Sequence, residues 1–110
     1  MTTRYLLNSA VIPVGADGIY DYHTLSQAEA VDWLTTHQFT SRIGYQNTAD
    51  FIERISNVRV EISRAASEFL PGDEALIVRL AYRETDPGTK TGQTAQRNDF
   101  VFGLLTSLKL

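Results

Sequence analysis

Short apolar runs, separated by turn-forming residues, dominate the pattern of hydrophobic and polar positions along the chain. The run at residues 4–8 predicts a first strand, and residues 19–22 predict a second strand or an extended approach to a helix. Residues 75–82 form the strongest apolar run, and because it starts apolar on both faces it predicts a strand in the centre of a sheet. Residues 100–105 predict a strand that closes the fold.

The stretch before the central strand has a more varied pattern. Residues 39–43 predict a short strand or an extended loop. Apolar and polar side chains alternate over residues 58–63, which predicts a half-buried strand. Residues 64–69 have the composition for one helical turn, but a continuing or neighbouring strand is the preferred interpretation. Residues 71–73, Pro-Gly-Asp, predict a turn.

A first helix is predicted to start at a capping box and to end near residue 36. The sequence offers two overlapping boxes, Thr24 with Gln27 and Ser26 with Glu29. Trp33 is expected in the core, because a lone Trp on an apolar helix face is usually buried. A second helix is predicted to begin with Asn47 as its N-cap and Asp50 at N3, near the positive end of the helix. Asn57 suits the left-handed position that ends this helix.

Together these elements predict one α+β domain over residues 1–110, with a mixed sheet and two helices. The length of 110 residues leaves room for a single core. Residues 84–98 are almost entirely polar and cannot bury themselves, so they are predicted to be a mobile loop. A long loop in a small domain is often functional.

The composition excludes several classes of function. The chain has no cysteine, which rules out a disulfide scaffold, a thiolate metal site and a cysteine nucleophile. It has two histidines, too few to favour a histidine-built metal site, so we expect neither a metal nor another cofactor. The net charge of −3 argues against long DNA or RNA as a partner, which needs a broad basic face. Because the sequence has no long apolar run and no signal peptide, we expect no membrane contact and a cytoplasmic location.

The general catalytic motifs are missing from the sequence. It contains no Walker loop, no GxGxxG fingerprint and no HExxH pair. His23 and His37 lie on either side of the first predicted helix and are interpreted as solvent-facing loop residues. Composition and spacing alone therefore reach no further than an α+β domain.

A series of segments nevertheless resembles a known family. The segments are YLLNS at residues 5–9, IGYQNTA at 43–49, VEISR at 60–64, PGDEALIVRL at 71–80 leading to Arg83, and FGLLTSL at 102–108. In their order and spacing they resemble the viral ring nucleases, the type III anti-CRISPR family, over nearly the whole chain except residues 84–98. Each segment is weak alone, and the series is fairly specific.

This resemblance implies a ring-nuclease-like domain that forms a homodimer with a ligand pocket on the two-fold axis. The family's ligand is cyclic tetra-adenylate, a messenger made by type III CRISPR complexes, and its members degrade it and so silence the nucleases that it activates. The implied chemistry needs no metal. A ribose 2′-hydroxyl attacks the adjacent phosphodiester in line, and the products are di-adenylates with a 2′,3′-cyclic phosphate. A viral member acts in the cytosol of its host.

The resemblance also implies roles for individual residues. Arg64 and Arg83 take the positions of arginines that bind phosphate or stabilise the transition state. Asn47 and Thr48 take the positions of small polar residues that can donate to a phosphate, or they simply cap the helix. Asn8 takes the position of an Asn that holds either the adenosine or the loop.

The sequence departs from the family at its catalytic position. The family has Gly followed by a His that acts as general acid, and here the pair is Gly44-Tyr45. A tyrosine, with a reference pKa near 10, is a poor proton donor at neutral pH, and losing general acid–base help costs about 10²–10⁴-fold in rate. The loop is also one residue longer, so either Glu84 or Asp86 takes the family's acidic role. Tyr45 can instead stack on an adenine, or it is a packed aromatic at a strand–helix junction.

These features predict a protein that binds a cyclic oligoadenylate, cyclic tetra-adenylate first of all, and neutralises it mainly by sequestration with slow or no cleavage. One alternative is an active ring nuclease that uses Tyr45, His23 or His37. Another is a sponge for a different cyclic nucleotide signal of host defence. A regulator that binds DNA or protein is a further class, and the net charge disfavours DNA.

Overall fold

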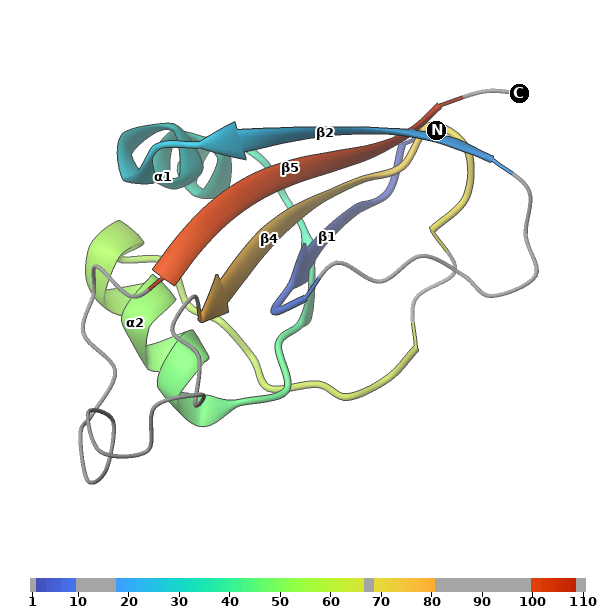
Figure 1. Ribbon diagram of the computed structural model, residues 1–110. Helices are drawn as coiled ribbons and strands as arrows, with labels where there is room; N and C mark the ends of the chain where they lie inside the picture. The colour runs from blue at the N-terminus through green and yellow to red at the C-terminus, as the bar shows by residue number, and fades with distance from the viewer. Residues whose placement is uncertain (1, 10–17, 67–68, 81–99, 109–110) are drawn as a thin grey trace, which may run out of the picture.

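The computed structural model describes residues 2–9, 18–66, 69–80 and 100–108. Within them the elements follow in the order β1 (Arg4–Leu7), β2 (Ile19–Leu25), α1 (Gln27–Thr36), β3 (Thr40–Arg42), α2 (Gln46–Ser56), β4 (Glu74–Leu80) and β5 (Phe100–Leu108) (Figure 1). The mobile loop predicted at residues 84–98, and the last two residues of the strand predicted at 75–82, lie outside the described residues.

One five-stranded sheet joins all the strands in the order β2-β5-β4-β1-β3. β1 runs parallel to both of its neighbours, β3 and β4, whereas β5 is antiparallel to β4 and to β2. The predicted α+β class with a mixed sheet and two helices is confirmed, and β4 is a central strand as its two apolar faces predict. Because parallel strands end at the same edge, β1, β3 and β4 all finish on one side of the sheet.

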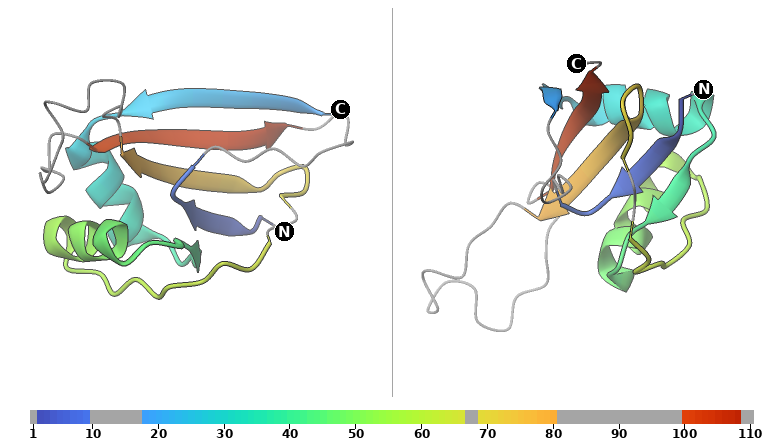
Figure 2. Two further views of the ribbon diagram at one scale, coloured as in Figure 1. Left: turned by 60° about the horizontal axis from the view of Figure 1, so that its bottom comes forward. Right: turned by 90° about the vertical axis from the view of Figure 1, so that its right-hand side faces the viewer.

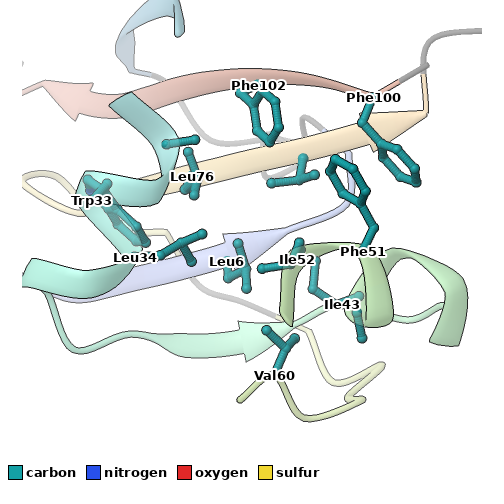
Figure 3. Packing of buried hydrophobic residues seen from close by; sticks show 13 residues of the cluster. Leu6, Trp33, Leu34, Ile43, Phe51, Ile52, Val60, Leu76, Phe100 and Phe102 are labelled. Carbon is teal, nitrogen blue, oxygen red and sulfur yellow. The ribbon is translucent and has the colours of Figure 1, made fainter. Parts of the chain in front are cut away.

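Both helices cover the same face of the sheet, and the main core lies between them and the strands (Figures 2 and 3). Phe51 of α2 stacks on Phe100 of β5, with ring centroids 4.1 Å apart and planes 10° from parallel. Trp33 of α1 is buried as predicted. Its indole N–H donates to Glu74 Oε1 at 2.9 Å, and Arg4 Nε donates to the same oxygen at 2.9 Å. The polar atom of this buried aromatic is therefore satisfied.

The local signals at three chain reversals are confirmed. Ser26 and Glu29 form the capping box of α1, while Thr24 belongs to β2. Asn57 ends α2 in the left-handed conformation, with φ 59°. Gly72, with φ 94°, lies in the predicted turn before β4, where its missing side chain permits that backbone angle.

Helix α2 begins earlier than the sequence predicts. Its N-cap is Tyr45, whose extended backbone accepts the N–H of Ala49 at 3.1 Å and so starts the helical ladder. The prediction of Asn47 as N-cap is therefore wrong, and Thr48 rather than Asp50 occupies N3. Asn47 lies in the first turn, and its Oδ1 accepts the N–H of Thr48 at 2.9 Å.

The strand predicted at residues 58–63 is also wrong. The segment passes beside β3 but makes only a single bridge, between Ile43 and Ile62. The N–H of Val60 donates to the Glu53 carboxylate of α2 at 2.8 Å. Because a side chain of the helix takes this donor, the alternating pattern produces an extended connection that meets the sheet edge at this one bridge and adds no further strand.

Phe69 covers the face of the sheet that carries no helix. Its ring is 5% exposed and packs on a second apolar cluster, where it stacks on Tyr20 at 6.1 Å between centroids and 12° between planes. Its φ of 48° is uncommon for a bulky residue and cannot continue a strand. The prediction of a strand over residues 64–69 is therefore wrong for the residues that the structure describes. The chain bends at Phe69, and the ring of Phe69 packs on the sheet.

Replacing Phe69 tests this packing. We expect Phe69→Ala to lower the free energy of unfolding by about 3 kcal/mol, because the ring is buried and leaves a cavity. Urea denaturation followed by circular dichroism measures the change. The neighbouring Leu70→Ala is the control, since Leu70 is 54% exposed and its loss should cost about 0.5 kcal/mol or less. Equal effects of the two substitutions would contradict the covering role of Phe69.

Candidate ligand-binding site

A hollow of about 360 Å³ opens where β1 and β3 end. We call it the β3 pocket, and it is lined by Leu7, Asn8, Ser9, Arg42, Gly44, Tyr45, Arg64, Ala65, Ala66 and Phe69. The edge at which parallel strands finish is a common place for ligands in sheets that contain parallel strands. No carboxylate is among these lining residues, although the chain as a whole is acidic.

A second hollow of about 370 Å³ adjoins the first. We call it the α2 pocket, and it is lined by Asn8, Ser9, Tyr45, Asn47, Thr48, Arg79 and Leu80. It lies between the end of β4 and the start of α2. The two pockets share Asn8, Ser9 and Tyr45, so they lie side by side, and together they make up the candidate site.

Two side chains hold the turn at Gly44 from opposite sides. Asn8 Oδ1 accepts the Gly44 N–H at 3.0 Å, and Arg64 Nε donates to the Gly44 carbonyl at 3.0 Å. A Cβ at Gly44 would lie 3.3 Å from Cγ of Arg64, so a larger residue there would require the Arg64 side chain to shift by a few tenths of an ångström. Asn8 therefore ties the end of β1 to the turn at Gly44.

Tyr45 is a strongly exposed aromatic residue at the junction of β3 and α2. It is 57% exposed and makes no side-chain cap for the helix. The Arg64 guanidinium lies over its ring, 5.4 Å from the centroid, which is the geometry of a cation–π contact. The ring lies at the expected junction, but it is not packed into the core.

The N-terminus of α2 adds positive character beside the α2 pocket. The first N–H groups of a helix have no partner within the helix, and the N-cap Tyr45 side chain supplies none. The first turn also carries no acidic residue that would offset the helix dipole. Thr48, whose N–H bonds to Asn47, is itself buried. Asn47 and Thr48 thus border the α2 pocket rather than the β3 pocket.

Arg42 is a pocket residue that sequence reasoning missed. It ends β3, pairs with Leu7 in the parallel register and shares the β3 pocket with Arg64. Its Nη1 donates to the Ser41 carbonyl at 3.1 Å, while its Nε is buried without a hydrogen-bond acceptor among the described residues. Arg42 lies at the pocket because residues 40–42 pair with β1, and no local sequence pattern specifies that pairing.

The histidines lie away from both pockets. His23 is in β2 and not in a loop as predicted, and its Nε2 is 2.7 Å from Asp21 Oδ2 on the surface. His37 ends α1, packs against Trp33 and lines a shallow hollow beside the start of β1. Within the described residues, no group of three His, Cys, Asp or Glu side chains comes together in a way that could hold a metal ion.

Three of the residues to which the resemblance gives roles fall outside the described part of the chain, namely Arg83, Glu84 and Asp86. The others that it implies are brought together: Asn8 and Tyr45 border both pockets, Arg64 borders one, and Asn47 and Thr48 border the other. Among the described residues, neither helix is long and apolar enough to cross a membrane.

Comparison with known proteins places the chain in a family. The uncharacterized protein YddF of Bacillus subtilis (strain 168) is 26% identical over 104 residues, covering 93% of this chain and 94% of YddF. The solved structure of B116 of Sulfolobus turreted icosahedral virus matches with a TM-score of 0.73 at 15% identity, covering 94% of this chain and 98% of that one. At that identity the match shows a common fold. The model of the STIV B116-like family matches residues 4–100, so the chain belongs to the STIV B116-like family.

Proposed function

We propose that the protein binds a cyclic oligoadenylate of type III CRISPR signalling, cyclic tetra-adenylate, and neutralises it mainly by sequestration with slow or no cleavage. The observation that carries this proposal is the cluster of Asn8, Gly44, Tyr45 and Arg64 at the border of two adjoining pockets. These residues belong to the segments in which the sequence resembles the viral ring nucleases.

The charge of the site suits such a ligand. A cyclic tetra-adenylate carries four phosphodiester groups in a compact ring, so it needs a few converging cations and not a broad basic face. Arg64 supplies one such cation, and the described residues that line its pocket include no carboxylate. The net charge of −3, which disfavours long nucleic acid, therefore does not count against a small anion.

The shape of the site provides for the bases as well. The exposed Tyr45 ring offers a surface on which an adenine can stack, and stacking on an aromatic contributes about 1–3 kcal/mol per base. Because Tyr45 stands between the two pockets, a ligand that follows the site passes its ring. A homodimer, with two copies of this site facing across a two-fold axis, would match the repeat of a cyclic ligand.

Sequestration is favoured over rapid cleavage because the described residues that line the two pockets include no His, Asp or Glu that could act as a general acid. By the resemblance, Tyr45 takes the position of the histidine of the viral ring nucleases, and neither His23 nor His37 lines either pocket. A ring that is held in line can still be cleaved slowly through proximity alone. Slow cleavage at a tightly binding site removes the messenger from circulation chiefly by holding it.

The binding test places the protein in excess over radiolabelled cyclic tetra-adenylate and analyses the mixture on a native gel and by thin-layer chromatography. We expect a shifted band that contains intact ligand. Arg64→Ala and Arg83→Ala should each weaken binding about tenfold or more, because a charge-assisted contact is lost. Arg59→Ala, an exposed residue outside both pockets, should leave affinity unchanged.

Several outcomes would contradict the proposal. Many turnovers to di-adenylate would replace sequestration with true ring-nuclease activity. If no cyclic oligoadenylate of any ring size shifts the protein band on the native gel, both sequestration and ring-nuclease activity are refuted. Affinity that is unchanged in both Arg64→Ala and Arg83→Ala would mean that the ligand binds elsewhere.

Substituting Tyr45 by His tests the missing acid. We expect Tyr45→His to raise single-turnover cleavage of cyclic tetra-adenylate by about 10²–10⁴-fold, because an imidazole can protonate the leaving oxygen near neutral pH. The rate should fall as pH rises above the imidazole pKa. Tyr45→Phe is the matched control, since it keeps a stacking ring and supplies no acid. A Tyr45→His variant that binds the ligand but cleaves no faster would refute the missing acid as the reason for slow cleavage.

A further inference from the structure

We propose that Arg42 is the side chain that grips a phosphodiester in the β3 pocket, through the edge of its guanidinium that carries Nε and Nη2. The identity of the ligand rests on the proposed function, whereas the contact itself requires only a phosphodiester. The resemblance assigns no role to Arg42, and the case for it comes from the position and the hydrogen bonds of its side chain.

The backbone fixes where Arg42 lies. Arg42 pairs with Leu7 in the parallel register of β3 and β1, and both residues line the β3 pocket. Phe69 lines it too, so the arginine stands beside an apolar wall instead of open water. An ion pair in such a setting is less screened than one on the open surface.

The hydrogen bonds of Arg42 leave one edge of its guanidinium without an acceptor among the described residues. Nη1, the nitrogen on the same side as Cδ, donates to the Ser41 carbonyl at 3.1 Å. Nε and Nη2 point their N–H groups in the same direction, and this pair is the edge that matches two oxygens of a phosphate. Nε is buried and has no acceptor among the described residues.

An unsatisfied buried donor needs an explanation, because most buried polar atoms in folded proteins have a partner. Nε of Arg42 is closed off from solvent by its surroundings, so the guanidinium turns toward the pocket as it takes up a ligand oxygen. Among the described residues the one arginine or lysine paired with a carboxylate is Arg4, which bonds Glu74, so no carboxylate neutralises Arg42 either. A ligand oxygen that enters the pocket supplies the missing acceptor and the missing negative charge together.

Arg64 does not offer the same edge. Its Nε is already bonded to the Gly44 carbonyl, and its guanidinium lies over the Tyr45 ring. These contacts make Arg64 the residue that shapes the turn and adds charge. Arg64 is thus anchored to the turn at Gly44, whereas Nε and Nη2 of Arg42 have no protein acceptor among the described residues.

The test compares Arg42→Gln and Arg42→Lys with the wild type, and uses Arg59→Gln as the control outside the pocket. We expect Arg42→Gln to weaken the binding of cyclic tetra-adenylate about tenfold or more. Arg42→Lys should recover only part of the loss, because an ammonium restores the charge without the paired donors. Arg59→Gln should bind as the wild type does. Urea denaturation of each variant shows that it is folded.

A second measurement needs no variant and no cyclic ligand. The Nε–H signals of the arginines are recorded by nitrogen-15 NMR while adenylyl-(3′→5′)-adenosine, which has a single phosphodiester, is added to the wild-type protein. We expect the Arg42 Nε–H signal to shift with saturation and the Arg59 signal to stay in place. This readout tests the contact directly even if Arg42→Gln fails to fold.

The outcomes separate this inference from the proposed function. If the dinucleotide shifts the Arg42 signal but cyclic tetra-adenylate does not bind, the contact stands and the proposed ligand is wrong. If cyclic tetra-adenylate binds while the Arg42 signal is unmoved and Arg42→Gln keeps full affinity, the inference is overturned and the proposed function survives. If neither ligand binds or moves the signal, both are overturned.

Discussion

The parallel pairing of β1 with β3 on one side and with β4 on the other is the constraint on which the candidate site depends. It makes three strands finish at one edge, so Asn8, Arg42 and Leu80 come to the same end of the sheet although they are far apart in the sequence. The turn at Gly44 can then be held by Asn8 from the end of β1 and by Arg64 from the returning chain. An antiparallel β3 would send Gly44, and the start of α2 with it, to the opposite edge.

The regular elements were largely predictable because the signals for each of them come from residues close together in the sequence. The capping box of Ser26 and Glu29, the left-handed Asn57 and the turn at Gly72 all act over a few residues. The strand predicted at residues 58–63 failed for the opposite reason. Its side chains alternate as those of a half-buried strand do, but the carboxylate of Glu53 on α2 accepts the N–H of Val60. No local sequence pattern predicts that hydrogen bond.

The site was only partly accessible to such reasoning. Resemblance pointed to Asn8, Tyr45 and Arg64, which the fold gathers around one turn, but it offered nothing on Arg42. Finding Arg42 requires the register that sets it opposite Leu7, and register between distant strands is a property of the folded sheet. The start of α2 at Tyr45 was not predicted, because an asparagine side chain caps a helix better than a tyrosine side chain does. In the structure the extended backbone of Tyr45 makes this residue the N-cap, although its side chain forms no cap bond.

Phe69 has a place both in the apolar cluster under the bare face of the sheet and in the wall of the β3 pocket. Its backbone, with φ 48°, would suit a glycine or an asparagine better than a phenylalanine, yet neither could supply the ring that the cluster requires. At this position the backbone conformation favours a glycine or an asparagine, whereas the packing of the cluster requires a large apolar side chain. A substitution at Phe69 therefore changes the packing of the cluster and the shape of the pocket wall in the same step, so the stability of the fold and the form of the pocket are coupled at this residue.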